Sequence, residues 1–580
     1  MDLAYFKHIN LYHALCRFFA DLNIPVNYLT ETPAAPQAIL TDTYNPNNPA
    51  HQLMREVYVV GGIDDAIFNR RTAALDPQQL KARDYEGLLI FGVTLQRSGD
   101  LPTRSQMAEI TRAFNREFHY TPVIIVFSYD HYLSFASCER LPYKQTWREG
   151  EKTGKVSILK DVDPAHPHTG HLKILETLKI ERSGKQAITS FEALYQYWQR
   201  VFSVALLNKR FYQELANWYF WAMDQVSFPD DVEKNPAIRN ATSLIRLITR
   251  VIFIWFIKEK QLVPDILFDR REMRRILKTF ADTPDAHSYY NAILQNLFFG
   301  TLNQKMNERR FAEDTQHYVK ADHGVKNLLR YQEFFSISAP EVLALFANIP
   351  FLNGGLFDCL DKDAADTGKH VFVDGFTRNA AKRAIVPDLL FFRDETIWDL
   401  NALYGTKNKT YTVKGLFDIL AAYKFTIAEN TPIEEEIALD PELLGKVFEN
   451  LLASYNPETQ TTARKQTGSF YTPREIVNYM VDESLIAYLS NALQNSPPGR
   501  GEGWVASEVE ARLRHLLAYT DAPHQFTDAE VAALMTALHT AKILDPACGS
   551  GAFPMGMLHK MVHILTKLDP ANVRWRETQR

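Results

Sequence analysis

Cysteine is scarce in this sequence. Its 580 residues include four cysteines, Cys16, Cys138, Cys359 and Cys548, which lie far apart along the chain. Zinc sites and the disulfide frameworks of secreted domains need cysteines at short, paired spacings, which this distribution does not offer. We therefore expect no metal site and a protein of the reducing cytoplasm.

A leader and a membrane-spanning run are also lacking. The first residues, MDLAYFKHINLYHALCRFF, do not place a basic segment before an apolar core, as a secretory signal would. The longest strongly apolar run, Val251 to Ile257, is far shorter than the roughly 20 residues that span a bilayer. The expectation is a soluble, untargeted protein.

The chain has no excess of positive charge. Its 64 Lys and Arg stand against 69 Asp and Glu, which gives a formal net charge of -5. A surface that binds nucleic acid must therefore be a local patch or be supplied by another segment. With 46% hydrophobic residues the composition is typical of globular proteins, and the length predicts about three domains.

The first part, residues 1–175, is predicted to be an α/β domain. Three apolar stretches, VYVVGGI, GLLIFGVTL and PVIIVFSY, are rich in strand-forming residues, and a helical segment, Arg104 to Phe118, separates the last two. The stretches TWREGEKTGKV and DVDPAHPHTGH that follow are dense in charge, Pro and Gly. They predict a loop and a domain boundary near residue 175.

Residues 176–460 are predicted to form a large helical region. One helical face is expected from Leu194 to Ala205, and a buried helix from Ser243 to Lys260. We interpret their aromatic residues as core and not as a ligand site. The acidic run Glu434 to Glu436 predicts a solvated face, and Asp440 before Pro441 predicts a capped helix start.

The segment Ala541 to Met557, AKILDPACGSGAFPMGM, predicts a strand, a tight turn and a helix. The short strand Ile543 to Leu544 ends in Asp545, and glycines let a ligand approach the turn before the helix N-terminus. A phosphate-binding loop would need a following Gly-Lys-Ser/Thr, and a dinucleotide site needs GxGxxG spacing; both are absent. A plain turn would explain the glycines but not Asp545.

A second segment lies upstream at Thr467 to Val481, TGSFYTPREIVNYMV. As a purely structural pattern it predicts a helix with Thr472 as N-cap, Pro473 in the first turn and Glu475 completing a capping box. Between the two segments, the stretch Asn491 to Asp521 is interpreted as a surface insertion that contains a helix.

DPACGSGAF closely resembles the cofactor loop of the amino-methylating DNA methyltransferases, and FYTP is similar to their second cofactor motif. This order of the motifs is that of the adenine-specific gamma group. The phrases WFIKEK, FLNGGLF, FTIAEN and DPELLGKVFENLL look like those of large single-chain restriction-modification enzymes and phage-exclusion methyltransferases. The resemblance covers roughly residues 240–570.

The resemblance implies S-adenosylmethionine as cofactor, double-stranded DNA as substrate, and a Rossmann-like domain that begins in residues 461–580. An Asp beside the turn fits a cofactor that carries a sulfonium and an ammonium group. The cofactor-binding residues implied by the two motifs are Tyr471, Thr472, Pro473, Asp545, Ala547, Gly549, Gly551 and Phe553.

The sequence departs from that family in its catalytic residues. The family holds the extruded adenine with an Asn-Pro-Pro-Tyr or Asn-Pro-Pro-Phe motif, which this sequence lacks; Pro497 and Pro498 follow Ser496 and precede the cofactor loop. We expect no methylation by this chain alone, and a second polypeptide that carries the catalytic motif and the target-recognition domain. A split-gene subunit, a frameshifted product, a truncated sequence and a non-catalytic binding module all stay open.

The resemblance also implies that the first domain is where such enzymes often hold a nuclease of the PD-(D/E)xK type, which needs an Asp and an acidic-x-Lys on neighbouring strand ends. Asp84 precedes a strand, but that strand reads FGVTLQ and offers neither acid nor lysine. A structural or DNA-contacting role is expected instead. Lys144, Arg148, Lys152 and Lys155 form a candidate phosphate patch, for which a solvated loop is the alternative.

Overall fold

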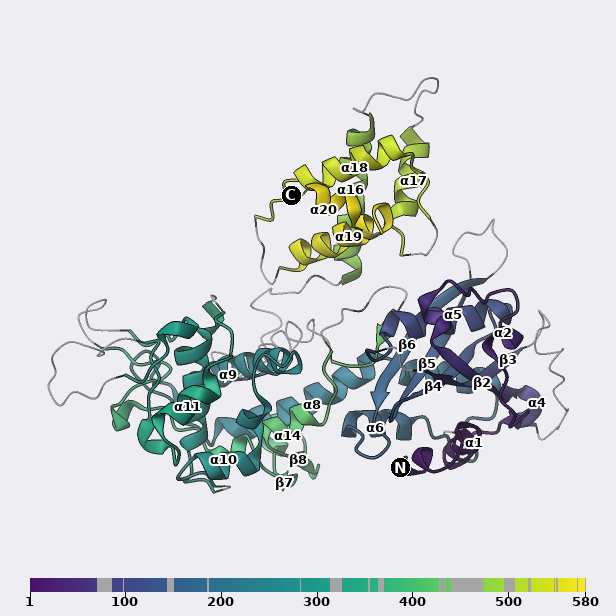
Figure 1. Cartoon of the computed structure of the whole chain (residues 1–580). Helices are drawn as coiled ribbons and strands as arrows, with labels where there is room; N and C mark the ends of the chain where they lie inside the picture. The colour runs from purple at the N-terminus through teal and green to yellow at the C-terminus, as the bar shows by residue number, and fades with distance from the viewer. Residues whose placement is uncertain are drawn as a thin grey trace. The chain divides into compact units, whose positions relative to one another are not determined.

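The computed structural model divides the chain into two compact units, Met1–Ala463 and Arg464–Arg580 (Figure 1). It describes all residues except 70–85, 97–98, 143–150, 185–186, 282, 313–325, 353–354, 363–369, 427–429, 431–433, 440–471, 473, 495–505, 520–522, 547, 549–550, 571 and 579–580. The fold is mixed α/β, as the sequence predicts. The division of the chain into three domains stays a prediction.

A seven-stranded sheet organises the first part of unit 1. Its strands, in spatial order, are β1 (Asn27–Tyr28), β2 (Met54–Asp64), β3 (Gly87–Leu95), β4 (Val123–Tyr129), β5 (Tyr132–Pro142), β6 (Glu151–Val162) and β9 (Glu434–Glu436). The pairs β3–β4 and β6–β9 are parallel, and the other pairs are antiparallel. The three apolar stretches of the sequence are confirmed as β2, β3 and β4.

Helices cover both faces of this sheet. The crossover helix α5 (Arg104–Glu117) lies on one face, and α1 (Leu11–Asp21) and α6 (Thr169–Thr177) lie on the other (Figure 1). Burial on both faces explains why β3 and β4 are apolar throughout and do not alternate with polar residues. The short helices η1 (Ala4–Lys7), α2 (Pro36–Ile39), α3 (Pro49–Gln52) and α4 (Asp65–Phe68) complete this region.

The edge strand β9 overturns one prediction. Glu434, Glu435 and Glu436 are buried and do not form a solvated face. Their carboxylates pair with cations of distant segments: Glu434 with Arg104 and Arg112, Glu435 with Lys155, and Glu436 with Lys424. Burying a carboxylate costs free energy unless the carboxylate is paired with a cation. These cations therefore allow the acidic strand β9 to be buried at the edge of the sheet.

The polar connector after β5 is also not a simple loop. Glu151 to Val162 forms β6, which pairs with β5 and β9, so that part of the loop prediction is wrong. The remainder of the first stretch, residues 143–150, lies outside the described residues. Irregular chain follows β6 and leads into α6, whose first residue is Thr169.

The helical region begins with two helices, whereas the sequence predicts one continuous helical face from Leu194 to Ala205. α7 (Phe191–Val201) ends before Ser203, whose side chain caps α8 (Val204–Met223). The next helix, α9 (Pro236–Glu259), confirms the predicted buried helix and begins seven residues earlier than expected, at Asn235–Pro236. It has the length and apolar composition of a membrane span, but most of it is buried within the protein.

The rest of unit 1 consists of short elements around the same core. The helices are η3 (Asp265–Phe268), α10 (Arg270–Ile276), the π-helical η4 (Tyr290–Gln295) and η5 (Phe298–Leu302), η6 (Met306–Glu308), η7 (Gln332–Phe334), α11 (Ala339–Phe346), η8 (Gly355–Phe357), η9 (Ala380–Lys382), η10 (Asp388–Leu390), α13 (Asn401–Tyr404) and α14 (Leu416–Ala421). The strands β7 (Thr396–Trp398) and β8 (Tyr411–Val413) form a separate antiparallel pair.

Unit 2 is helical in the part that the structure describes. Its helices are α16 (Arg474–Gln494), α17 (Ala506–Leu517), α18 (Asp528–Thr540), α19 (Ala552–Leu568) and α20 (Val573–Thr578). The helix predicted inside the insertion is confirmed as α17. The predicted strand at Ile543 and Leu544 does not form, because a strand needs a neighbour and the described residues of unit 2 provide none.

Candidate cofactor site

In the turn before α19, the structure describes the backbone conformation of Gly551. Gly551 adopts a left-handed conformation with φ of 82° and precedes the first residue of the helix. Its N–H donates to the carbonyl of Cys548, which closes the turn, and a Cβ at this position would meet nothing within 4 Å. The site needs glycine for its backbone angle, and space is open above the turn.

The helices that follow the two cofactor motifs, α16 and α19, pack against each other. A Cβ on Gly556 would lie 2.7 Å from Cγ1 of Val477, so a glycine in α19 permits close contact with the first turns of α16. Further along both helices, Lys560 pairs with Asp482 at 2.9 Å. The contacts advance in the same direction along the two helices, so their N-termini lie at the same end of unit 2.

The predicted cofactor residues are only partly described. Thr472, Asp545 and Phe553 are partly buried, and Phe553 packs against the core of unit 2. Tyr471, Pro473, Ala547 and Gly549 lie outside the described residues. The structure therefore brings together the N-termini of α16 and α19, and the roles of the individual motif residues stay predictions.

A buried lysine stabilises the helices beneath these turns. The Lys560 ammonium donates to the carbonyl of Leu517 at 3.1 Å, pairs with Asp482 and lies 4.0 Å from the centre of the Tyr519 ring. Burial lowers the pKa of Lys560, although the Asp482 carboxylate opposes that shift. This side chain ties α16, α19 and the C-terminus of α17 together.

Two more side chains of α19 reach the end of α17. Lys567 donates to the carbonyl of Ala518 at 2.7 Å, and a ring nitrogen of His563 lies 3.2 Å from the same oxygen. Positive and polar groups at this position satisfy the carbonyls that a helix leaves exposed at its C-terminus. Burial lowers the pKa of His563 to about 4, so its ring is neutral near pH 7.

The arrangement offers complementary features for a zwitterionic ligand. Two helix N-termini at one end of unit 2 favour a carboxylate, and the Asp545 carboxylate favours a cation. Among the residues that the structure describes, no group of three or more His, Cys, Asp or Glu side chains could hold a metal ion.

The candidate phosphate patch of the first domain is described only in part. The Lys155 ammonium forms an ion pair with Glu435 of β9 and is partly buried. Lys144 and Arg148 lie outside the described residues, and of Lys152 the structure describes only the backbone, which pairs with Leu141. Lys155 thus has a structural partner, and DNA contact by this patch stays a prediction.

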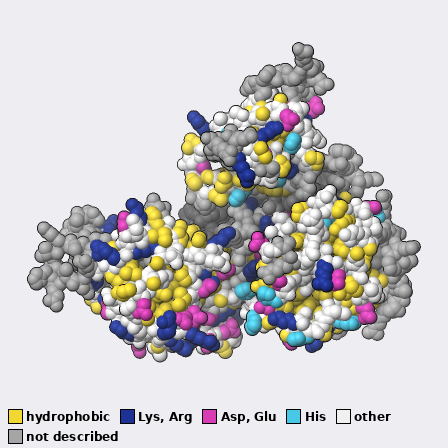
Figure 2. Space-filling model, in the orientation of Figure 1, with side chains coloured by type: hydrophobic (Ala, Val, Ile, Leu, Met, Phe, Trp, Pro, Cys, Tyr) yellow, Lys and Arg dark blue, Asp and Glu magenta, His cyan; other side chains and the backbone are white. Residues whose placement is uncertain are grey.

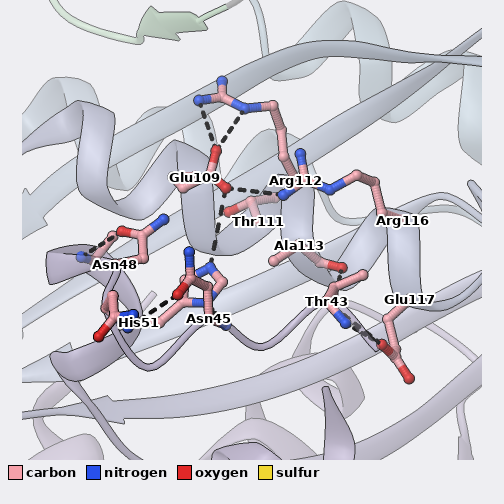
Figure 3. Close-up of polar contacts among 12 residues, drawn as sticks. Thr43, Asn45, Asn48, His51, Glu109, Thr111, Arg112, Ala113, Arg116 and Glu117 are labelled. Carbon is pink, nitrogen blue, oxygen red and sulfur yellow. Dashed lines mark hydrogen bonds and ion pairs between the residues drawn. The ribbon is translucent and has the colours of Figure 1, made fainter. Parts of the chain in front are cut away.

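The nuclease hypothesis gains no support from the described strands. β3 carries Gly92, Val93, Thr94 and Leu95 where an acidic-x-Lys pair would be needed, and Asp84 lies outside the described residues. Sequence reasoning did not find the polar cluster of this domain, which lies on α5 instead (Figure 3).

Glu109 is the centre of that cluster. Its carboxylate bonds with Arg116 at 2.9 Å and Arg112 at 3.4 Å, and it lies 4.0 Å from Nε2 of His51 (Figure 3). Nδ1 of His51 accepts a hydrogen bond from the N–H of Asn45. Burial lowers the pKa of His51, and at 1% exposure the ring has no access to a substrate. His51 therefore has a structural role.

A second carboxylate of α5 holds the adjacent loop. Glu117 accepts hydrogen bonds from the Thr41 and Thr43 hydroxyls and from the N–H groups of Asp42 and Thr43. It therefore satisfies a turn that leads towards α3. No spacing pattern in the sequence indicates this contact, because Glu117 and the residues that bond to it lie more than 70 residues apart.

Comparison with known proteins gives one informative similarity. The chain is 25% identical over 328 residues to a protein of Methanocaldococcus jannaschii that is provisionally named a type II restriction enzyme and methyltransferase. The match covers 56% of this chain and 21% of that protein. No family model matches the chain, and no solved structure matches it significantly. The similarity relates the chain to restriction-modification proteins.

Proposed function

We propose that this chain provides the S-adenosylmethionine-binding part of a DNA methyltransferase that modifies the amino group of adenine, within a restriction-modification or phage-defence system. The observation that supports the proposal is the parallel packing of α16 and α19, whose N-termini, which follow the two cofactor motifs in the sequence, lie at one end of unit 2. A turn formed for structural reasons alone would not need this convergence.

The described residues fit the methionine end of the cofactor. The first turn of α19 would receive the carboxylate, and Asp545 would hold the ammonium group. Gly551 leaves open space above the turn, where any other residue would be strained by the positive φ. When bound, S-adenosylmethionine supplies the methyl group and the sulfonium charge that makes it transferable.

These residues would contribute to catalysis by orienting the cofactor. Thr472 and Phe553 would limit how the cofactor lies across the turn, and the packed helices would keep it in place while the adenine approaches. The target base must leave the duplex to be modified, so a segment that binds the flipped base is required.

We propose that a second polypeptide or segment carries the Asn-Pro-Pro-Tyr or Asn-Pro-Pro-Phe motif and the target-recognition domain. We infer its binding surface on this chain from exposed apolar residues. Leu544 is 87% exposed and Ile543 is 52% exposed, and both lie in extended chain directly before the turn. Tyr479 and Met480 of α16 and Leu558 and Val562 of α19 are also exposed, opposite the core of unit 2. Strands paired beside Leu544 would cover such a surface.

The test is isothermal titration of the purified chain with S-adenosylmethionine, alone and with the protein encoded by the adjacent reading frame. We expect binding that tightens with the partner, followed by methyl transfer to adenine in duplex DNA. The variant Asp545→Ala should weaken binding at least about tenfold, because a charge-assisted contact is worth roughly 1.5 to 3 kcal/mol. Glu508→Ala, which removes an exposed carboxylate of α17, is the matched control.

The helical content in circular dichroism should be unchanged in Asp545→Ala, since Asp545 lies in irregular chain. Global unfolding of the variant would leave the site without support. A chain that binds no cofactor, with or without the partner, would be a non-catalytic binding module and would contradict the proposal.

A further inference from the structure

We infer that a groove along α8 in unit 1 binds a nucleoside phosphate, at a site separate from the turn before α19. The groove consists of two hollows of about 460 and about 400 Å³, which meet at Gln213 because this residue lines both. The first hollow lies between α6 and α8, and the second lies between α8 and residues 404–412. Small-molecule sites in proteins have volumes of roughly 300 to 1,000 Å³.

One polar face of α8 forms the floor of both hollows. Its members are Arg210, Gln213, Glu214 and Asn217. Their spacing of three and four residues places them on the same side of the helix. The other faces of α8 carry buried apolar side chains, which fix the helix in the core of unit 1 between α6 and β8 (Figure 1). The floor of the groove is therefore rigid.

The first hollow presents a guanidinium group that is available to an anion. Arg210 donates a hydrogen bond to the hydroxyl of Thr177 at 2.9 Å. It forms no ion pair with the acidic residues that the structure describes. A guanidinium has several N–H donors and cannot lose its charge in a protein, so one hydrogen bond to a hydroxyl leaves most of its binding capacity unused.

The two carboxylates that line the first hollow have cationic partners of their own. Glu214 pairs with Lys173 at 3.0 Å and with Lys414 at 2.8 Å. Burial opposes the ionisation of Glu214, yet the two ammonium groups lower its pKa. Glu176 pairs with the amino group of Met1 at 2.6 Å. Figure 2 shows Lys and Arg side chains close to Asp and Glu side chains in the region where Figure 1 places α8 and β8.

The second hollow is neutral apart from one lysine, and none of the described residues that line it is acidic. The Tyr404 hydroxyl donates to Oδ1 of Asn217 at 2.9 Å, and Nδ2 of Asn217 donates to the carbonyl of Thr412 at 3.2 Å. The rings of Tyr404 and Tyr411 are stacked, with their centres 5.0 Å apart. This hollow therefore offers flat rings beside an ordered polar network.

Three polar groups at the rim of the second hollow are available to a ligand. They are the hydroxyls of Thr410 and Thr412 and the ammonium group of Lys409. All three residues are exposed, and these groups make no hydrogen bond to another residue that the structure describes. Gln213 is also exposed and donates to Asn217 at 3.1 Å. The hollow can therefore bind a polar, planar group with hydroxyls.

Together, the hollows match the two ends of a nucleoside phosphate. The planar guanidinium fork of Arg210 matches phosphate oxygens. Amides and hydroxyls can bond to the edge of a base, and tyrosine rings can stack on its face. At 1.5 Å per residue, Arg210 and Asn217 lie about 10 Å apart along the helix, so one ligand with an anionic end and a flat end can reach both hollows. The walls on both sides favour a free nucleotide over a strand of nucleic acid.

The experiment is isothermal titration of the full chain with ATP, adenosine and inorganic triphosphate. We expect ATP to bind at least about tenfold more tightly than either fragment, because both hollows contribute. Arg210→Gln should weaken ATP binding about tenfold, since it removes a charge-assisted contact, and leave adenosine binding unchanged. Thr412→Val keeps the shape of an exposed side chain and removes its hydroxyl. It should weaken ATP and adenosine about fivefold and leave triphosphate binding unchanged.

The matched control is Lys407→Ala, which removes an exposed cation from the same segment but does not line the groove, and should change none of these values. Circular dichroism checks that Arg210→Gln folds, and Thr412→Val decides the test if it does not. The inference is overturned if the wild-type chain does not bind ATP, if triphosphate binds as tightly as ATP, or if both groove variants bind ATP normally.

Two further measurements separate the competing sites and ligands. ATP binding should be unchanged in Asp545→Ala, and its loss there would place ATP at the turn before α19 and overturn the inference. A thymidine pentanucleotide should bind more weakly than ATP. Tighter binding of the pentanucleotide would assign the groove to single-stranded nucleic acid and would also overturn the inference.

Discussion

Asp388 illustrates what burial does to a single residue. Its side chain has no exposed surface, and its carboxylate accepts hydrogen bonds from the N–H of Tyr289 and the hydroxyl of Ser288. Burial raises the pKa of Asp388 to about 6, and these hydrogen bonds compensate only in part. The residue therefore titrates within the range of ordinary buffers.

The raised pKa predicts a pH-dependent stability of unit 1. The folded protein binds the Asp388 proton more tightly than the unfolded chain, whose carboxyl has its ordinary value of 3.8. The stabilisation is complete below pH 3.8 and is lost as the pH rises through 6. Asp388→Asn should remove this dependence, on the order of 3 kcal/mol between pH 4 and 7.5.

Urea unfolding of the wild-type chain and of Asp388→Asn at pH 4.5, 6 and 7.5 checks this prediction. The variant should gain relative stability at the higher pH values. The exposed Asp42→Asn is the control and should parallel the wild type. A constant difference between Asp388→Asn and wild type at all three pH values would contradict the prediction.

At the scale of the element, β9 shows how an acidic strand can be buried. Three successive glutamates join a sheet edge because α5, β6 and Lys424 each supply a cation. Lys424 and Lys160 also act on Asp161: burial opposes ionisation, yet the two ammonium groups lower the pKa of Asp161 to about 2. The edge of the sheet is therefore held by a network of ion pairs.

Glu434→Ala should loosen this edge. The change removes the Glu434 carboxylate that contacts the largely buried Arg104 and Arg112, and breaking a buried pair costs about 3 kcal/mol. Amide hydrogen exchange should become faster in β6, whose residues Val156 to Ile158 pair with β9. Glu508→Ala in unit 2 is the control; equal exchange in β6 for both variants would show that Glu434 does not hold the edge.

At the scale of the whole molecule, the two units have separate hydrophobic cores. The core of unit 2 is formed by α16 to α19, and the cores of unit 1 lie on the two faces of the sheet and among the helices of the middle region. Separate cores can unfold separately, because cooperativity depends on shared buried contacts.

Calorimetry of the chain should therefore show two thermal transitions. S-adenosylmethionine at about 100 times its Kd should stabilise the transition of unit 2 by about 2.7 kcal/mol and leave that of unit 1 in place. Asp545→Ala should abolish this shift, whereas Glu508→Ala should retain it. A ligand-induced shift of the unit 1 transition would place the cofactor elsewhere.

The predictions that hold are those based on local patterns. The strands β2, β3 and β4 and the helices α5, α17 and α19 follow from apolar runs, helical spacing and a glycine turn, all readable within about 15 residues. The predictions that fail depend on distant partners. Glu434 to Glu436 are buried and pair with cations up to 330 residues away in the sequence. Among the described residues of unit 2, Ile543 and Leu544 lack the neighbouring strand that a strand requires.

The sequence by itself determined the composition class, the main strands and helices of both units, and the two motifs that resemble a methyltransferase cofactor site. Each depends on residues close together in the chain. Only the tertiary structure decided that β9 forms an edge of the seven-stranded sheet, that Lys155 pairs with Glu435, and that α16 and α19 are in contact at Val477 and Gly556. The physical reason is that ion pairing and close packing depend on distances in space, which spacing along a sequence does not specify.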